Sequence, residues 1–543
     1  MIELLAANPL LLLFVVAAIG YGIGNIKIRG SKLGVAAVLF VGLFFGSMDK
    51  SLEIPNIVFL LGLAIFVYTI GLTSGPGFMA GFQGKGNKNL GFIFGMIVFS
   101  GLLAGALFFL FDFTAAMTAG IFTGASTNTA GLAGLLDSIQ KTISSPDQER
   151  MLESAVVGYS ITYPMGVIAG MLAIVLMERL FRIDYEQEAK SLRHQYPIDS
   201  EIVSTTLEIT SDELKHVSIR DLLNTHKWNI AFGRMRRGEE TLLTHLDTEF
   251  QVGDFVAVVG RENDIEEFAK MFGQYAEKEI TREPSNIEHH RVFISNPEVA
   301  GQAIAALNLR ERFAVVITRV RRGDIDLLAK GDTVLELGDR VRFTAKSKDV
   351  PALIRLFGDS YQKLSQIDLL SFGMGMALGL LLGMITFTLP GGISFQFGFA
   401  GGPLIVALIL GTLRRTGPIV WTLPYSANLT LRQFGLILLL AAVGIRSGHT
   451  FIDTLQQGNA IWIFLGGSMI SLGTAFVTLF VGFKLLKIPF GILTGMVANQ
   501  PAILDFALHR SNNLLPNYGY TMMFPIALIS KIVLAQLIFS LLV

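Results

Sequence analysis

The sequence predicts a polytopic α-helical membrane protein, built from two inverted repeats with about five crossings plus one re-entrant hairpin each, and a water-exposed insert between them. Three observations lead to this fold class. The 543 residues are 51% hydrophobic and only 16% charged, a composition typical of multi-pass membrane proteins. Short motifs of the first half recur in the second half in the same order. Most of the charge lies in one central segment.

The repeated motifs are rich in glycine and lie in hydrophobic sequence. They recur about 360 to 373 residues apart: GLTSGPGF at 71–78 with GIRSGHTF at 444–451, GIFTG at 120–124 with GILTG at 491–495, and GYSITYP at 158–164 with GYTMMFP at 519–525. Internal symmetry between two hydropathic halves is typical of secondary transporters. The pattern therefore favours transport.

Apolar stretches close to the ~20 residues that cross a bilayer define the helices. In the first half they cover 8–24, 33–47, 56–73, 90–111 and 153–180, and in the second 368–389, 398–413, 431–446, 459–483 and 519–542. The stretches 114–136 and 490–507 carry glycine or proline and a central polar run, which a lipid-facing helix does not tolerate. We expect a re-entrant hairpin or broken helix at each of these two places.

Positive charge in short loops indicates the cytoplasmic side. Applied to both halves, this rule gives them opposite orientations and predicts inverted repeats. The basic residues that this rule places on the cytoplasmic side are Lys27, Arg29, Lys32, Lys85, Lys88, Arg179 and Arg182 in the first half, and Arg414, Arg415, Lys484, Lys487, His509 and Arg510 in the second.

The charged insert, residues 183–364, holds 25 of the 43 Lys+Arg and 31 of the 43 Asp+Glu residues, and we place it in the cytoplasm. RMRRG at 234–238 recurs 85 residues later as RVRRG at 319–323. Each copy alternates apolar residues around Gly-Asp turns and ends in a helix, the pattern of a small α+β module. The predicted domains are membrane repeat 1 at 1–182, modules at 183–282 and 283–364, and membrane repeat 2 at 365–543.

The modules resemble the C-terminal subdomain of the regulator-of-potassium-conductance family, which often binds a small ligand or dimerises. The modules, the GLTSGPGF motif at 71–78 and the STNTAGL motif at 126–132 occur in one chain. With this combination the whole chain resembles the aspartate:alanine exchanger family. The resemblance implies electrogenic antiport of external aspartate for internal alanine, not enzymatic catalysis, by a homodimer in the bacterial inner membrane. Neither a cofactor nor a metal is expected, and the insert lacks the Gly-x-Gly-x-x-Gly fingerprint of dinucleotide binding.

The two polar hairpins are the predicted substrate site. Broken helices expose backbone N–H groups that bind carboxylates without a buried cation. The candidates are Ser126, Thr127, Asn128 and Thr129 in the first hairpin, with Asn499, Gln500 and Pro501 in the second. The alternative is that these small polar residues only let the helices pack and hydrogen-bond.

Three ionisable residues of the second half have two interpretations each. Arg446 either forks around the distal carboxylate of aspartate or extends to the membrane interface from a helix end. Asp505 either balances the substrate ammonium or pairs with His509 one turn later. Lys531 lies mid-span and is either a substrate or ion-coupling partner or a buried cation paired with Asp505.

Glycine and proline inside the spans, with two neighbouring tyrosines, are candidate gating or hinge positions, and simple packing is the alternative. They are Gly71, Gly75, Pro76, Tyr159, Pro164, Gly444, Tyr520 and Pro525.

Other functions fit the same sequence. An exchanger or exporter of other amino acids or dicarboxylates would use the same hairpins, and a channel or carrier gated by the modules is a second alternative. The expected partners are the amino-acid substrates, membrane lipid and a second copy, with no nucleic acid. Arginines 234, 236, 237, 319, 321 and 322 either receive an anionic effector or the membrane surface, hold a dimer together, or are simply solvated.

Overall fold

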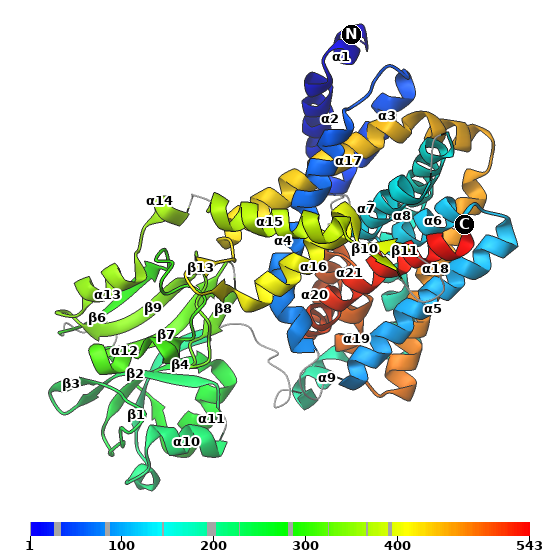
Figure 1. Cartoon of the computed structure of the whole chain (residues 1–543). Coiled ribbons are helices and arrows are strands. Elements are labelled where there is room, and N and C mark those ends of the chain that lie inside the picture. Colours follow the sequence, from blue (N-terminus) through cyan, green and yellow to red (C-terminus); the bar gives the residue numbers. More distant parts are fainter. Residues whose placement is uncertain are drawn as a thin grey trace. The chain divides into compact units, whose positions relative to one another are not determined.

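The structure is a computed structural model that describes residues 2–26, 34–81, 87–143, 146–192, 202–226, 228–280, 286–323, 325–364, 368–388 and 394–543. These residues form two compact units (Figure 1). The helical unit comprises 1–198, 373–412 and 429–543, and the module unit comprises 199–372 and 413–428. The predicted boundaries at 282/283 and 364/365, and Lys27, Arg29, Lys32 and Lys85, fall at least partly outside the described residues.

Helices occupy every apolar stretch of the first half. They are α1 (Ile2–Ala7), α2 (Pro9–Gly24), α3 (Ala37–Met48), α4 (Asn56–Gly81), α5 (Asn87–Phe111), α6 (Ala115–Ala125), α7 (Thr129–Thr142), α8 (Asp147–Phe181) and α9 (Tyr185–Leu192). The predicted break inside 114–136 is confirmed, because α6 and α7 are separated at residues 126–128.

The second half follows the same succession. Its helices are α15 (Leu369–Met384), α16 (Gly398–Leu413), α17 (Tyr425–Gln456), α18 (Ala460–Phe480) with a π-helical extension over Val481–Leu485, α19 (Phe490–Val497), α20 (Pro501–Ser511) and α21 (Leu515–Leu542). The short strands β10 (Thr386–Thr388) and β11 (Ser394–Gln396) lie between α15 and α16. The second predicted break is confirmed between α19 and α20.

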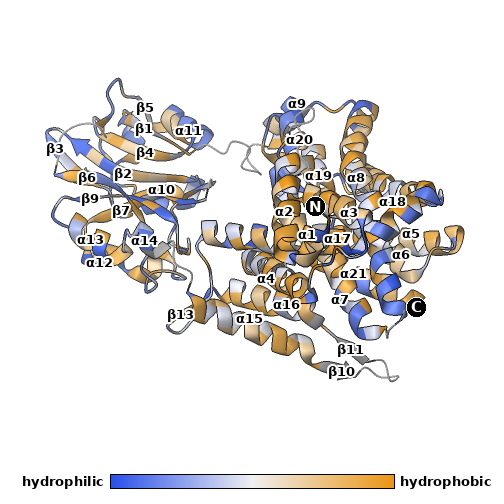
Figure 2. Cartoon of the chain, turned by 90° about the horizontal axis from the view of Figure 1, so that it is seen from above, coloured by the Kyte–Doolittle hydropathy of each residue, from blue (hydrophilic) through white to orange (hydrophobic). Residues whose placement is uncertain are grey.

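Length and composition make these helices membrane-type. Five segments among the described residues are long and apolar enough to cross a bilayer, 56–76, 91–111, 147–181, 425–456 and 460–485, and α21 is a sixth if its two halves, bent by 41°, count as one span. Apolar helices of 10–17 residues include α2, α15 and α16. Figure 2 shows most of these helices predominantly hydrophobic. The helical membrane fold is thus confirmed, and the inversion of the repeats stays a prediction.

Repeated glycines allow equivalent helices of the two halves to approach closely. A Cβ on Gly124 of α6 would lie 2.4 Å from the carbonyl oxygen of Tyr159 in α8, and one on Gly495 of α19 would lie 1.8 Å from that of Pro516 in α21. Both distances are too short for a side chain. The repeated GIFTG and GILTG motifs therefore have the same structural role. Each allows a hairpin helix to pack directly against the last long helix of its own half.

The module unit contains two antiparallel sheets with the same topology. The first module has β1 (Ile202–Ile209), α10 (Ile219–His226), β2 (Ile230–Arg237), β3 (Glu240–Leu243), β4 (Phe255–Arg261), α11 (Glu262–Phe272) and β5 (Gly273–Tyr275); the second has β6 (Ile287–Phe293), α12 (Leu309–Arg312), β7 (Val315–Arg322), β8 (Ile325–Leu328), β9 (Arg340–Lys346) and α13 (Val350–Phe357). The strand orders are β3-β2-β4-β1-β5 and β8-β7-β9-β6. The predicted duplication and both closing helices are confirmed.

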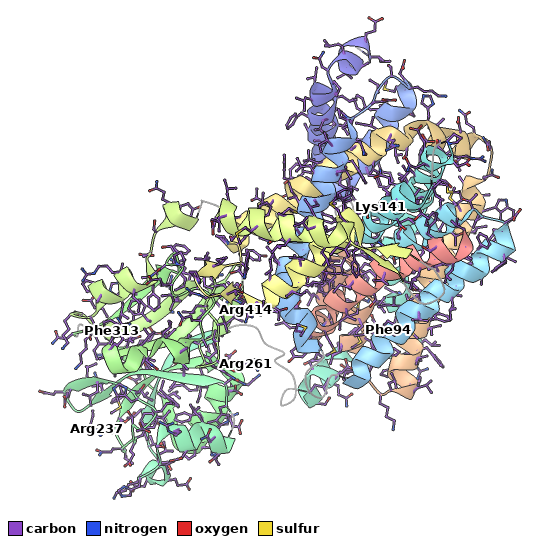
Figure 3. The ribbon with its side chains drawn as sticks, viewed as in Figure 1. Phe94, Lys141, Arg237, Arg261, Phe313 and Arg414 are labelled. Atoms are coloured by element: carbon purple, nitrogen blue, oxygen red, sulfur yellow. The ribbon has the colours of Figure 1, made fainter. Side chains whose placement is uncertain are left out.

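One ion pair recurs at the same place in both modules. Arg237, labelled in Figure 3, binds Asp254 through two hydrogen bonds of 2.9 and 2.7 Å. Arg322 binds Asp339 in the same way, at 2.8 and 2.7 Å. Both aspartates follow the tight Gly-Asp turn and are buried. These two arginines therefore hold the turn inside their own module, because a bidentate pair fixes both geometry and charge.

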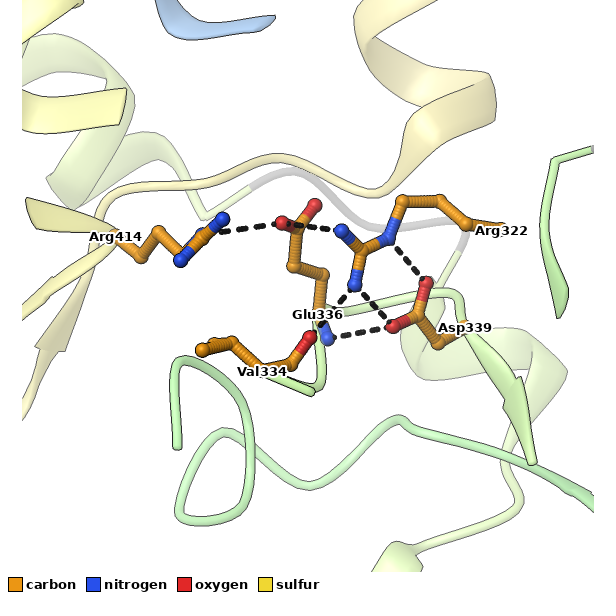
Figure 4. A network of polar contacts seen from close by, with 5 residues as sticks. All are labelled: Arg322, Val334, Glu336, Asp339 and Arg414. Carbon is orange, nitrogen blue, oxygen red and sulfur yellow. Dashed lines mark hydrogen bonds and ion pairs between the residues drawn. The ribbon is translucent and has the colours of Figure 1, made fainter. Parts of the chain in front are cut away.

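The connection between α16 and α17 belongs to the second module (Figure 4). Glu336 forms ion pairs with Arg322 at 2.7 Å and with Arg414, the residue after α16, at 3.2 Å. Burial raises the pKa of Glu336, and the two arginines oppose that rise. Arg415 donates to the carbonyl oxygens of Pro297, Glu298 and Ala300. The chain therefore enters α17 directly from a segment anchored on this module.

A substitution at Gly495 tests the close helix contact. Gly495→Ala should lower the unfolding temperature of the detergent-solubilised protein, since overpacking of this kind costs about 1–3 kcal/mol. Gly91→Ala is the matched control, because a Cβ at Gly91 would meet nothing within 4 Å. The unfolding temperatures are measured by fluorescence-detected size-exclusion chromatography after heating. Equal unfolding temperatures for the two variants would contradict the packing role of Gly495.

His289 should make the module unit sensitive to acid. Burial, and then Arg234, Arg342 and His290, lower its pKa to about 4, and its Nδ1 lies 2.7 Å from the Thr344 hydroxyl. The folded state therefore binds fewer protons than the unfolded state below the usual histidine pKa of about 6.5. The contribution of His289 to the free energy of unfolding is therefore fully present above pH 6.5 and is lost as the pH falls towards 4.

The corresponding experiment compares unfolding temperatures at pH 7 and pH 4.5. His289→Gln should lose a few degrees less than the unsubstituted chain on acidification, and His216→Gln, at an exposed histidine, should behave like the unsubstituted chain. An identical acid response of all three proteins would show that His289 does not titrate in this way.

Candidate functional site

The first hairpin tip comprises Ser126, Thr127 and Asn128, all buried, between α6 and α7. Thr127 adopts a left-handed backbone with φ of 48°, which reverses the chain. Asn128 then caps α7, because its Oδ1 accepts a 3.0 Å hydrogen bond from the backbone N–H of Gly131. Its Nδ2 donates to the carbonyl oxygen of Leu528 in α21, at 3.4 Å. Asn128 thus joins this tip to the opposite half.

The second tip, at residues 498–500, is joined to the other half in the same manner. Gln500 Oε1 accepts a hydrogen bond of 3.1 Å from the Tyr163 hydroxyl of α8. Asn499 Oδ1 accepts one of 2.5 Å from Lys531 Nζ in α21. Proline stands in the first turn of α20, where its missing N–H costs no hydrogen bond. The second tip therefore contacts both of the long helices, α8 and α21, that flank it.

A cavity of about 160 Å³ lies between the two tips. Its wall contains polar residues of both hairpins, two tyrosines and two cationic side chains. The polar lining residues are Ser126, Thr127, Asn128, Thr129, Asn499, Gln500, Tyr163, Tyr520, Arg432 and Lys531. Neither aspartate nor glutamate occurs among the described residues that line it. The cavity is therefore suited to a ligand with net negative charge.

One polar atom at the first tip has no hydrogen-bond partner in the described part of the chain. The Thr127 hydroxyl is buried and forms no hydrogen bond with any described residue. A buried hydroxyl without a partner is costly, and Thr127 lines the cavity. It is thus available to a bound molecule or to water.

A second cavity, of about 60 Å³, adjoins the same tips. It is lined mainly by α5 and α18, with Ser471 and Thr474 among its polar residues. Ser126, Asn499 and Lys531 line both cavities. These three residues consequently form part of the wall between the two.

The helix ends at the tips add partial charges. The C-terminal ends of α6 and α19 and the N-terminal ends of α7 and α20 meet there. N-terminal ends attract anions, and C-terminal carbonyls attract cations. A zwitterionic molecule can therefore find both kinds of partner at one place.

Two predicted substrate residues lie elsewhere. Arg446 is paired with Glu149 at 3.7 Å and lines a different cavity, with Gln140 and Ser447 among its neighbours. Asp505 is exposed and lines neither tip cavity. Within the described part of the chain, no ion pair joins Asp505 to His509 or Lys531. The structure thus places Arg446 at another cavity, whereas Asp505 lies outside the wall of the tip cavity but within electrostatic reach of Tyr520, which lines it.

The predicted hinge glycines are sites of close packing. A Cβ on Gly71 or Gly75 of α4 would lie 2.6 or 2.4 Å from atoms of α16. A Cβ on Gly444 of α17 would lie 2.5 Å from the carbonyl oxygen of Leu39 in α3. Pro76 lies inside α4, which continues to Gly81.

Tyr159 and Tyr520, also predicted hinge residues, lie beside the tips. The Tyr159 hydroxyl is 2.8 Å from that of Thr129, and Tyr520 lines the cavity. Pro164 lies inside an uninterrupted α8, whereas Pro525 lies between the two halves of α21 that are bent by 41°. Of these two prolines, only Pro525 coincides with a bend.

Sequence reasoning missed several contributors to this site. Tyr163 was overlooked because it resembles an ordinary packing residue, and Arg432 because it is near the start of a long span. A buried acidic residue outside the two tip cavities was missed as well: Asp137 pairs with Lys141 at 3.2 Å and accepts from the backbone N–H of Phe399 at 3.1 Å; Lys141 is labelled in Figure 3. The sequence signal that could have identified Asp137 is an aspartate within an apolar hairpin helix.

The fold and the tip cavity define a multi-pass membrane transport protein. Residues 12–179 and 371–540 match the family described as the predicted permease membrane region of the aspartate–alanine exchangers, and residues 290–358 match the TrkA-C domain. The chain belongs to this aspartate–alanine exchanger family. It is a transporter and not an enzyme, and as such a multi-pass protein of the bacterial cell membrane with a cytoplasmic TrkA-C region.

Several curated relatives align over their whole length. The chain is 50% identical to an uncharacterized transporter of Geobacter sulfurreducens and 45% identical to one of Symbiobacterium thermophilum, each covering 100% of both chains. It is 39% identical to an uncharacterized transporter of Corynebacterium glutamicum, over 99% of both chains. No solved structure matches the chain.

The cap at the first tip can be separated from its cross-half contact. Asn128→Ser keeps an oxygen for the Gly131 N–H but removes the donor to Leu528, whereas Asn128→Ala removes both. We expect Asn128→Ala to lose about 0.5–2 kcal/mol more stability than Asn128→Ser, and both to reduce transport. Equal unfolding temperatures would contradict the capping role of the side chain.

Proposed function

We propose that this protein exchanges aspartate for alanine at the cavity between the two hairpin tips. The observation that supports this most directly is the charge of the cavity wall, which contains Arg432 and Lys531 but no described acidic residue. Aspartate carries one net negative charge at neutral pH and complements such a wall. The family to which the chain belongs supports amino acids as the substrate class.

Lys531 is the candidate partner of the distal carboxylate. It is 8% exposed, and it donates a hydrogen bond to the neutral amide of Asn499. A buried cation bound to a neutral acceptor gains much from a carboxylate. Alanine lacks this carboxylate, so the same contact would distinguish the two substrates. The Thr127 hydroxyl and the N-terminal end of α7 would hold the α-carboxylate.

The ammonium group would lie at the C-terminal ends of α6 and α19. Carbonyl oxygens at helix ends bind cations without a buried acid. This arrangement leaves the net positive wall intact for the second carboxylate. It also allows alanine, which has no net charge, to occupy the site more weakly.

Alternating access would depend on the wall shared by the two cavities. Ser126, Asn499 and Lys531 line both, so a small movement of either tip would open one side and close the other. Inverted repeats supply two equivalent states for such a movement. The homodimer and the direction of exchange, aspartate inward and alanine outward, belong to the same proposal.

A dicarboxylate exchanger without amino-acid specificity is the second candidate. One observation favours it: no described carboxylate lines the cavity to receive an ammonium group. Succinate, which has both carboxylates but no amino group, distinguishes the two. Succinate should compete poorly with labelled aspartate if the helix ends select the ammonium group. If they do not, succinate should compete as strongly as unlabelled aspartate.

The test uses the purified protein in liposomes loaded with unlabelled aspartate or with buffer. Labelled aspartate should enter loaded liposomes faster than empty ones, and external alanine should inhibit the uptake. Lys531→Gln should reduce aspartate exchange at least tenfold, the effect of losing about 1.4 kcal/mol, and affect alanine exchange less.

Lys484→Gln is the matched control. Lys484 is a helix-end cation over the ring of Phe181, away from both tip cavities, so this variant should retain exchange. Absence of aspartate uptake with and without internal load would overturn the aspartate assignment. Equal losses of aspartate and alanine exchange in Lys531→Gln would overturn the role of Lys531 in selecting the distal carboxylate.

A further inference from the structure

The second hairpin begins with α19, and the cap on that helix comes from another part of the chain. Pro489 stands at the N-cap position of α19 and has no side-chain acceptor for the first N–H groups of the helix. Glu188 of α9 accepts hydrogen bonds from the backbone N–H groups of Phe490, at 2.6 Å, and of Gly491, at 2.8 Å. A negative charge at a helix N-terminus also complements the helix dipole. Glu188 is therefore both the cap and the charge partner of α19.

The first hairpin is capped within its own half. The N-cap of α6 is Thr114, whose hydroxyl accepts from the backbone N–H of Met117 at 3.2 Å. At the other end of this hairpin, Gln148 of α8 donates to the carbonyl oxygens of Gln140 and Ile143, at 2.7 and 2.9 Å. In the second hairpin the cap comes instead from α9, which follows α8 of the first half. The position of the second hairpin consequently depends on a contact between the two halves.

Both ends of the second hairpin are held by the short segment from Glu178 to Glu188. Arg510, in the last turn of α20, donates two hydrogen bonds to Glu178 near the end of α8. Tyr185 joins the two contacts, because its hydroxyl donates to Glu178 at 3.4 Å and its ring centre lies 6.2 Å from that of Phe490. The two glutamates thus fix the beginning and the end of the same hairpin.

A short helix connects the cap to the hairpin tip. α19 has eight residues, a length of about 12 Å at 1.5 Å per residue, and the tip follows it directly. Gly491 leaves room for the carboxylate, since a Cβ there would lie 3.0 Å from Glu188 Oε2. A helix of this length moves as a stiff rod. A displacement of its capped end therefore also displaces Asn499 and Gln500, which line the tip cavity.

We propose that Glu188 is a positioning residue for transport, which fixes the place of the second hairpin tip from the far end of α19. Glu188 is partly buried and lines neither tip cavity, so it acts through α19. Loss of its carboxylate lets α19 shift and lets the second tip open more often than the first. This role goes beyond the proposed exchange of aspartate and does not depend on which substrate the tips bind.

The experiment measures how often each tip opens. The chain contains no cysteine, so a single introduced thiol reports on one place. Ala498→Cys puts the thiol at the second tip, and Ala125→Cys puts it at the end of α6 beside the first tip. Both alanines are almost fully buried. The rate at which N-ethylmaleimide modifies each thiol in proteoliposomes therefore follows the local opening of that tip.

Glu188→Gln removes the charge and one of the two carboxylate acceptors while keeping the size of the side chain. It should raise the labelling rate of Ala498→Cys roughly fivefold, as expected when a partly buried carboxylate is lost from a helix N-terminus. The rate of Ala125→Cys should stay within about twofold. Glu186→Gln, which changes an exposed glutamate of the same helix, is the matched control and should leave both rates within about twofold.

A rise confined to the second tip supports the proposal. An equal rise at both tips would show a general loosening of the helical unit and would overturn the positioning role. An unchanged rate at both tips, or the same rise in Glu186→Gln, also overturns it. If Ala498→Cys does not fold together with Glu188→Gln, Val497→Cys, also at a buried position, takes its place.

The link to transport is tested in the exchange assay. Because a displaced tip contacts the substrate less well, Glu188→Gln should raise the aspartate concentration for half-maximal uptake roughly fivefold and change the maximal rate less. An unchanged half-maximal concentration would overturn the role of Glu188 in transport. Absence of aspartate uptake by the unsubstituted chain would overturn the proposed function instead, and the labelling comparison, which needs no substrate, would still decide the role of Glu188.

Discussion

Broken helices in a membrane require partners for the backbone groups that the break leaves free. Lipid supplies no hydrogen bonds, so these partners must come from the protein. In this protein Asn128 closes the first tip and also reaches α21, and Gln500 of the second tip is reached by Tyr163 of α8. Each tip therefore has one side-chain hydrogen bond to a long helix of the opposite half. The two halves thus meet at a shared polar centre, to which each contributes one hairpin tip and one long helix.

The close packing of the helices follows from the same requirement. Hydrogen bonds between the tips and the long helices are short-range, so the hairpins must lie directly against α8 and α21. Glycines at 124 and 495 make this possible, since any larger residue would overlap a backbone carbonyl. The polar centre holds Lys531 without an acidic partner among the described residues that line the cavity. In the proposed function, an anionic substrate would place a carboxylate beside Lys531.

The module unit is built on a different interaction, the buried pairing of arginine with aspartate at a tight turn. It occurs once in each module, and in the second module Glu336 extends it to Arg414. The segment after α16 is thus part of the module fold, while α16 itself packs on α4. A change in the modules has a covalent and well-anchored path to α16 and α17.

Local sequence was enough to predict the helices, both hairpin breaks, the charged insert and its internal duplication. These depend on apolar length, backbone breakers and repeated turn residues, which are visible in short windows. Which polar residues share a cavity emerged only from the folded chain. Arg446 and Lys531 are both cations in apolar helices, yet Arg446 pairs with Glu149 away from the tips and Lys531 reaches Asn499. Their difference depends on which face each helix turns towards residues far along the chain, and this is set by packing between the two halves.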